Sequence, residues 1–163
     1  MTELASLPLG NIRFTVRRAT AADIAAIVAL LVDDELGATR EAGADGDMGP
    51  YLRAFAAIDA DPNQLLLAVT AGDGGVAGTM QLTFLPGLSR HGALRAQIEA
   101  VRVGSAYRSH GLGQAMFTWA IAESRRRGAV LVQLTSDKSR TSAHRFYDRL
   151  GFVRSHEGFK LYL

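Results

Sequence analysis

The chain of 163 residues contains no cysteine. This absence excludes a disulfide framework, a thiolate metal site and a cysteine nucleophile. No apolar run approaches the roughly 20 residues that a membrane-spanning helix requires. The first residues, MTELASLPLGN, also lack the basic start and the apolar run of a signal peptide. We therefore expect a soluble cytoplasmic protein.

An excess of one charge is also missing, because the formal net charge is only +2. This balance does not demand a nucleic-acid partner. Hydrophobic residues make up 48% of the chain and charged residues 21%, which is enough apolar material for a core and argues against disorder. We expect one domain over residues 1–163, with residues 1–10 as a flexible N-terminal tail.

Arginines are nevertheless clustered in the second half of the chain. Three are consecutive, and four more follow within thirty residues: Arg125, Arg126, Arg127, Arg140, Arg145, Arg149 and Arg154. This cluster either serves an anionic ligand or marks solvated helix ends.

The spacing of apolar residues predicts alternating strands and helices. Period-two alternation or short apolar runs predict strands at 12–19, 64–70, 76–84, 94–103 and 129–136, and a closing hairpin at 152–163. Helical spacing predicts helices near 24–31, 51–59, 112–127 and 141–150. Antiparallel hairpins followed by a strand–helix–strand crossover imply a mixed sheet with helices on both faces.

A glycine-containing stretch, YRSHGLGQAM, joins the strand ending at Val103 to the apolar helix that follows. The start of a helix carries unpaired backbone N–H groups and a partial positive charge, and it is a ready site for phosphate. The N–H groups from Ser109 to Gln114 would face such an anion, and Arg108 would add charge. The alternative is a plain strand–helix connection in which Gly111 and Gly113 allow tight packing.

Two familiar phosphate-binding loops do not fit this stretch. The dinucleotide-binding fingerprint needs a third glycine where Met116 stands, and the Walker loop needs lysine where Gln114 stands.

The stretch from Arg108 to Gly113 matches the Gln/Arg-x-x-Gly-x-Gly/Ala signature of the GNAT superfamily of acetyl-CoA-dependent N-acetyltransferases. The preceding IEAVRV resembles the fourth strand of that family, and AHRFYDRLGF (143–152) resembles its last-helix motif. The order of elements is similar over nearly the whole chain. The resemblance implies a mixed, mostly antiparallel twisted sheet of six to seven strands, with about four helices on both faces.

The resemblance also implies that the glycine loop holds the pyrophosphate of coenzyme A. It implies that the fourth strand diverges from the next one, so that freed backbone groups bind the pantetheine arm. The expected cofactor-binding residues are Val101, Arg102, Val103, Arg108, Ser109, His110, Gly111, Leu112, Gly113, Gln114, Arg140, Ala143 and Phe146. No metal is expected. Arg140 is a departure, because many family members carry asparagine three residues before the alanine of the last helix.

An amine must be neutral to attack a thioester, and a lysine-like amine with a pKa of about 10.4 is protonated at neutral pH. A base must therefore accept a proton. Glu99 is the candidate, on the expectation that it shares a strand face with Gln97, Val101 and Val103. Its alternative role is a surface carboxylate paired with Arg95 or Arg102. A backbone N–H beside Val101 or Val103 would serve as the oxyanion donor.

Tyr147 matches the tyrosine of the last-helix motif and is the candidate acid for the departing thiolate. Its alternative role is a core aromatic that packs beside Phe146. His110 and His144 fit exposed helix or loop positions better than catalytic ones. His91, in the turn before the fourth strand, could face the substrate, but nothing in its spacing selects it.

The leading hypothesis is an enzyme that moves an acetyl group from acetyl-CoA to a primary amine of a small molecule or peptide. We expect direct attack in a ternary complex, since no cysteine can hold the acetyl group. One alternative is a non-catalytic coenzyme A-binding sensor or partner module, and another is an acetyltransferase for aminoacyl-tRNA. The acids Glu41, Asp45 and Asp47 either attract a cationic amine or belong to a solvated loop. A homodimer is possible, and a membrane partner is not expected.

Overall fold

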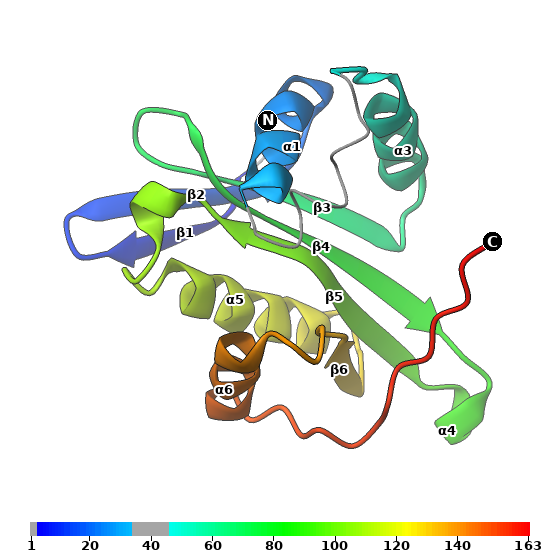
Figure 1. The fold of residues 1–163 in the computed structure, drawn as a ribbon. Coiled ribbons are helices and arrows are strands. Elements are labelled where there is room, and N and C mark those ends of the chain that lie inside the picture. The colour runs from blue at the N-terminus through cyan, green and yellow to red at the C-terminus, as the bar shows by residue number, and fades with distance from the viewer. Residues whose placement is uncertain (1–2, 34–45) are drawn as a thin grey trace.

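The computed structural model describes residues 3–33 and 46–163, and its centre is one open sheet (Figure 1). The spatial order of the strands follows the chain. The strands are β1 (Glu3–Leu9), β2 (Ile12–Arg18), β3 (Gln64–Thr70), β4 (Val76–Pro86), β5 (Leu94–Val103) and β6 (Leu131–Leu134). Neighbours from β1 to β5 pair antiparallel, whereas β6 pairs parallel with β5.

Helices cover both faces of this sheet. They are η1 (Ala21–Asp23), α1 (Ile24–Val32), α3 (Gly49–Ala60), α4 (Ser89–Gly92), η2 (Ser105–Tyr107), α5 (Leu112–Arg126) and α6 (Thr141–Arg149). Figure 1 shows α1 and α3 on one face and α5 and α6 on the other. The expected fold class, a mostly antiparallel sheet with helices on both faces, is therefore confirmed with six strands in the described part.

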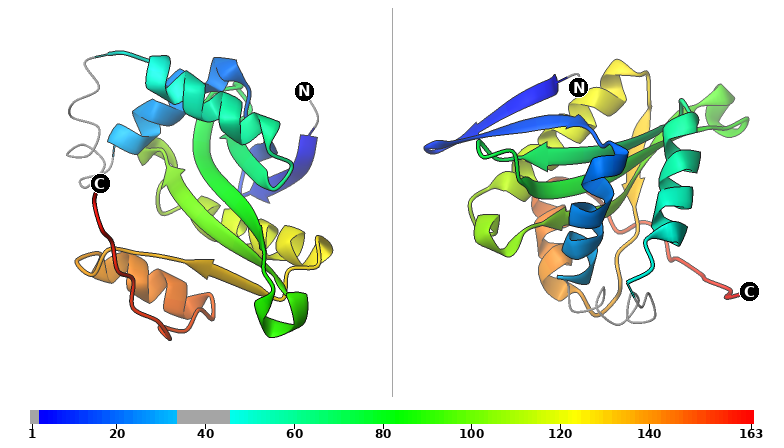
Figure 2. Two further views of the ribbon diagram at one scale, coloured as in Figure 1. Left: turned by 90° about the vertical axis from the view of Figure 1, so that its right-hand side faces the viewer. Right: turned by 90° about the horizontal axis from the view of Figure 1, so that it is seen from above.

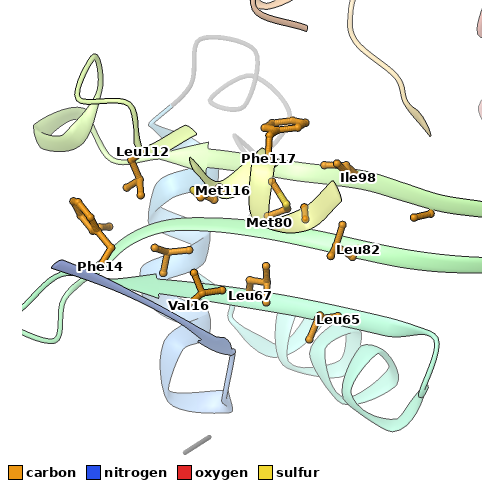
Figure 3. Close-up of a cluster of buried hydrophobic side chains, with 14 of the residues drawn as sticks. Phe14, Val16, Leu65, Leu67, Met80, Leu82, Ile98, Leu112, Met116 and Phe117 are labelled. Carbon is orange, nitrogen blue, oxygen red and sulfur yellow. The ribbon is translucent and has the colours of Figure 1, made fainter. Parts of the chain in front are cut away.

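The main core lies between the sheet and α5 (Figure 3). The helix contributes Leu112, Met116 and Phe117, each 1% exposed, to a layer of strand side chains. The strand residues of this layer include Phe14, Val16, Leu65, Leu67, Met80, Leu82 and Ile98. A smaller core forms beneath α1, where Ile24 and Ile27 pack with Ala68. Burial of these side chains fixes where α5 begins, and that position matters for the site.

The first residues are a strand, and the expectation of a flexible tail at 1–10 is wrong for the residues that the structure describes. β1 pairs antiparallel with β2, with Leu7 opposite Phe14. Every second side chain, at Ala5, Leu7 and Leu9, packs against the main core. This period-two pattern was present in the sequence and indicates a strand that is half-buried. Pro8 is compatible with an outermost strand, where one side of the backbone needs no partner.

The expected closing hairpin at 152–163 is also absent. Phe152 still packs on Phe117, with ring centroids 6.1 Å apart, but the residues after it form no strand. The right-hand view in Figure 2 shows this segment extending away from the body of the protein. Its sequence has strand character, yet it has no strand partner in the described part of the chain.

A buried ion pair joins β2 to the start of α1. Both nitrogens at the end of the Arg17 side chain donate to the Asp23 carboxylate, at 2.7 Å each, and the two side chains are only 12% and 10% exposed. The same carboxylate accepts from the Thr20 backbone N–H at 2.7 Å and from its hydroxyl at 2.8 Å. These hydrogen bonds, that from Arg17 above all, lower the pKa of Asp23 from 3.8 to about 2 against the opposing effect of burial.

We predict that Asp23→Asn lowers the free energy of unfolding at pH 7 by about 2 kcal/mol, the value of a pKa shift of this size. Because the pKa is lower in the folded protein than in the unfolded chain, the stabilisation is complete above about pH 4. It is lost as the pH falls towards 2. Urea unfolding of both proteins at pH 7 and pH 3 measures the difference.

Asp59→Asn is the matched control, since Asp59 is an exposed carboxylate with no hydrogen bond to the described residues. A loss that is equal at both pH values would contradict the ionic origin of the stabilisation.

Candidate active site

The start of α5 leaves a set of backbone donors unpaired. Gly111 is the residue before the helix, in the left-handed conformation with a φ of 82°, and no side chain within residues 3–33 and 46–163 caps this end. In the described residues, none of the six N–H groups from Ser109 to Gln114 donates a hydrogen bond to the protein. The first donor to find an acceptor is Ala115, whose N–H donates to the carbonyl of Gly111 at 3.0 Å. These donors, at the positive end of a 15-residue helix, suit an anion.

Packing on both sides holds this loop in place. The Tyr107 ring meets Phe14 edge-on, with centroids 5.4 Å apart. A Cβ added at Gly113 would lie 3.8 Å from Val103 and 3.9 Å from Phe146, so this residue lies close to both β5 and α6. Gly113, Val103 and Phe146, three of the expected cofactor-binding residues, therefore lie close together.

Arg108 has a different role from the expected free positive charge. Its Nε donates to the Val103 carbonyl at 3.0 Å, and a terminal nitrogen contacts the carbonyl and carboxylate of Asp33 at 2.7 and 2.8 Å. His110 contacts the Arg108 carbonyl through Nδ1 at 2.7 Å. Arg108 thus ties the loop to the end of α1.

The pairing of β5 with β6 ends before β5 reaches this loop. The parallel pairing joins Arg95–Ile98 to Leu131–Leu134 and then stops. Residues 99–103 of β5 still pair with β4, but within residues 3–33 and 46–163 no strand lies on their other side. The Val101 and Val103 carbonyls accept from the Arg102 and Arg108 side chains, so any ligand beside this stretch would be bound through backbone N–H groups.

A bulge at Ala100 reverses the faces of β5. The register with β4 shifts there, and Ala100 has a φ of 51°, a left-handed value for a residue with a Cβ. Ile98 before the bulge and Val101 and Val103 after it all pack on the α5 side. The expectation that Glu99 shares a face with Val101 and Val103 is therefore wrong. The sequence carried a signal, because the apolar positions of the strand step from 98 to 101.

Glu99 projects from the opposite face and is exposed, with Gln81 of β4 as its neighbour across the strands. In the described part of the chain it forms no ion pair, so the alternative of a carboxylate paired with Arg95 or Arg102 is not realised. Arg102 instead donates to the Val101 carbonyl at 2.8 Å.

Polar side chains extend from Glu99 across this face of the sheet. The side-chain oxygen of Gln64 accepts from Gln81 at 3.0 Å and from Thr83 at 2.9 Å. Gln133 donates to Gln97 at 2.8 Å, which links β6 to β5. This row was not predicted, although the polar positions of four expected strands held its members. Of the acids expected near it, Asp47 is described, whereas Glu41 and Asp45 lie outside the described residues.

Tyr147 belongs to a cluster of aromatic rings. Its ring centroid lies 5.6 Å from those of Phe117 and Phe146 and 6.2 Å from that of Phe152. The expected packing role is therefore present, and it positions the side chain between α5 and α6. Ala143, one turn earlier in α6, is half-buried.

Arg140 is the residue before α6, and its carbonyl accepts from the His144 backbone at 3.0 Å. The His144 ring contacts the Asp137 carbonyl at 2.8 Å. The arginine run lies at the end of α5, where the side chains of Arg126 and Arg127 both donate to the Glu123 carboxylate. The hydrogen bond from Arg126, first among several effects, lowers the pKa of Glu123. Part of the arginine cluster is thus accounted for by helix ends.

The described residues contain no group of three or more His, Asp or Glu side chains placed to hold a metal ion. None of the helices in the described ranges is long and apolar enough to cross a membrane.

Comparison with known proteins agrees with this geometry. The sequence profile of the acetyltransferase (GNAT) family matches residues 21–152. An aminoalkylphosphonate N-acetyltransferase of Salmonella typhimurium is 33% identical over 114 residues, which are 69% of this chain and 72% of that protein.

Solved structures show the same fold. A Bacillus halodurans C-125 protein described as a transcriptional regulator is 43% identical, with a TM-score of 0.87 over 92% of this chain and 99% of that one. A Trypanosoma brucei acetyltransferase is 25% identical, with a TM-score of 0.74 over 92% of this chain and 99% of that one. Because the family profile spans most of the chain and an N-acetyltransferase is among its relatives, the chain belongs to the GNAT family of acetyltransferases and is an N-acetyltransferase.

Proposed function

We propose that the protein transfers an acetyl group from acetyl-CoA to a primary amine of a small molecule or peptide, by direct attack in a ternary complex. The observation that carries this proposal is the set of unpaired N–H groups from Ser109 to Gln114, beyond the point where the pairing of β5 with β6 ends. The family generally uses acetyl-CoA, and this arrangement fits that donor.

The loop fits a pyrophosphate both sterically and electrostatically. Gly111 has no Cβ to block the approach, and its left-handed φ of 82° turns the chain into the helix. Leu112 is 1% exposed and anchors the helix start in the core, so the donors are held in position before any ligand binds. The freed side of β5, from Glu99 to Val103, would bind the amides of the pantetheine arm.

In this proposal acetyl-CoA supplies the activated acyl carbon, and the protein positions groups around it. Glu99 accepts the proton of the incoming amine, directly or through water. A backbone N–H beside Val101 or Val103 donates to the thioester oxygen as negative charge develops there, a contribution of roughly 3 kcal/mol. Tyr147 donates a hydrogen bond to the departing sulfur. The amine nitrogen forms its bond to the acyl carbon as the carbon–sulfur bond breaks.

The acceptor would approach from the face that carries Glu99 and the row of Gln64, Gln81 and Gln97. Carboxylate and amide groups there suit an ammonium group with further polar substituents. The Salmonella relative is described as acting on aminoalkylphosphonates, so an amine of that class belongs in any panel of acceptors tested.

We predict that Gly111→Asp weakens acetyl-CoA binding by about tenfold or more, which is about 1.4 kcal/mol. The new carboxylate would lie beside the phosphates. Gly111→Asn is the matched control, since asparagine and aspartate tolerate the left-handed conformation alike and differ in charge. Isothermal titration calorimetry at low salt measures both dissociation constants, and equal affinities for the two variants would argue against an anion at this loop.

We predict that Glu99→Gln lowers kcat by about 100-fold or more at pH 7, the usual range for loss of a general base. The dissociation constant for acetyl-CoA should change less than twofold. The deficit should shrink as the pH approaches about 10, because more of the amine is then neutral without help. Release of free thiol with the best amine of the panel gives the rate.

Glu3→Gln is the control for this variant, since Glu3 is an exposed carboxylate on β1, at the far side of the sheet. If Glu99→Gln retained normal turnover, or if its deficit stayed the same at every pH, Glu99 would not be the base.

A further inference from the structure

The side chain of Arg108 connects the glycine loop to two other elements. Its Nε atom donates to the Val103 carbonyl at the end of β5, at 3.0 Å. A terminal nitrogen donates to the Asp33 carbonyl at 2.7 Å and to the Asp33 carboxylate at 2.8 Å. Asp33 is the residue after α1. A planar guanidinium suits this arrangement, because its donors point in fixed directions and reach separate acceptors at the same time.

The end of α1 is a favourable place for this positive group. The last carbonyls of a helix have no partner within the helix and carry partial negative charge. Asp33 adds a carboxylate at the same end. Because α1 and α5 cover opposite faces of the sheet (Figure 1), Arg108 links the start of α5 to a helix on the face from which Glu99 projects.

A second contact brings α1 close to the same stretch of chain. Gly104 follows β5, and its N–H donates to the Ala77 carbonyl at 2.9 Å. A Cβ added at Gly104 would lie 3.4 Å from the Leu30 side chain of α1. The last turn of α1 therefore approaches this stretch both at Gly104 and at Arg108, which restricts the residues between them.

The residue after Arg108 has a strained backbone. Ser109 has a φ of 65°, a left-handed value that is costly for a residue with a Cβ and persists where surrounding contacts impose it. His110 contacts the Arg108 carbonyl through Nδ1 at 2.7 Å and closes the turn around Ser109. Ser109 also carries the first of the six N–H groups for which the described residues provide no acceptor. The position of Arg108 thus sets where this row of donors begins.

We propose that Asp33 is a positioning residue for acetyl-CoA: it holds Arg108, and Arg108 holds the N–H groups from Ser109 to Gln114 in the geometry that binds the pyrophosphate. Arg108 acts as a structural link and not as a free cation on the phosphates. This inference rests on the proposed use of acetyl-CoA. The Arg108 and Asp33 side chains are 48% and 47% exposed, so their ion pair adds little to the stability of the fold, and its loss acts on the loop.

Steady-state kinetics with two acetyl donors tests this proposal. S-acetylpantetheine has the thioester of acetyl-CoA but no phosphates, so it does not use the loop. We expect Arg108→Lys to lower kcat/KM for acetyl-CoA by about fivefold or more, because lysine keeps the charge and loses the rigid set of donors. The value for S-acetylpantetheine should stay the same.

Arg125→Lys is the matched control, since Arg125 is exposed at the other end of α5. If Arg108→Lys kept the natural kcat/KM for acetyl-CoA, the positive charge alone would be sufficient. If it lowered the values for both donors equally, the damage would not be specific to the loop. Either result would overturn the proposal.

The sign of the effect of Asp33→Ala separates positioning from charge. Loss of a carboxylate near a phosphate site favours an anionic ligand, so a charge effect alone would lower the dissociation constant of coenzyme A. We expect calorimetry to show a rise of about threefold instead, a modest one because the Asp33 carbonyl remains an acceptor. Asp59→Ala is the control, since it removes an exposed carboxylate that has no hydrogen bond to the described residues. An unchanged or lower constant for Asp33→Ala would overturn the proposal.

A double-mutant cycle shows whether Asp33 acts through Arg108. In the Arg108→Ala background, Asp33→Ala should leave the dissociation constant of coenzyme A unchanged. An effect as large there as in the natural sequence would contradict a role through Arg108. A natural protein that used S-acetylpantetheine as efficiently as acetyl-CoA would contradict the proposed phosphate site itself, and the inference would fail with it.

Discussion

The proposed acetyl-CoA site depends on backbone N–H groups at the start of α5 for which the described residues provide no acceptor. The first turn of any helix has such N–H groups, and most proteins satisfy them with a side-chain cap or with water. Here six consecutive donors precede Ala115, no side chain among the described residues caps the helix, and the helix start is fixed by the burial of Leu112. The donors therefore form a rigid, positive surface whose shape follows from the packing of the core. An anion at this surface gains hydrogen bonds and loses little to reorganisation.

The second constraint is the way β5 changes register. One extra residue at Ala100 lets the strand remain paired with β4 while Val101 and Val103 turn to the α5 side. Glu99 stays on the other face, and pairing with β6 has already ended at Ile98. A ligand that enters beyond the end of this pairing would thus meet backbone N–H groups along its length. The Glu99 carboxylate would reach that ligand from the sheet face opposite the glycine loop.

Much of this could be predicted from the sequence, and the failures have physical causes. Periodicity placed the five strands from β2 to β6 and the helices α1, α3, α5 and α6, and the glycine loop was located by residue type alone. The bulge at Ala100 was not predicted, because strict alternation of the strand was assumed beyond Ile98. β1 was not predicted, because a short strand that contains proline resembles a flexible tail. The role of Arg108 depends on Asp33, 75 residues away along the chain. No local pattern predicts a contact at that separation. Arg17 and Asp23 are only six residues apart, but their pairing crosses from β2 to the start of α1.

A crystal structure of the protein with coenzyme A tests the central claim most directly. The account predicts phosphate oxygens about 2.7–3.2 Å from several of the backbone nitrogens between Ser109 and Gln114, with the pantetheine arm along residues 99–103 of β5. A complex with the phosphates bound elsewhere, and with these nitrogens still facing solvent, would contradict it.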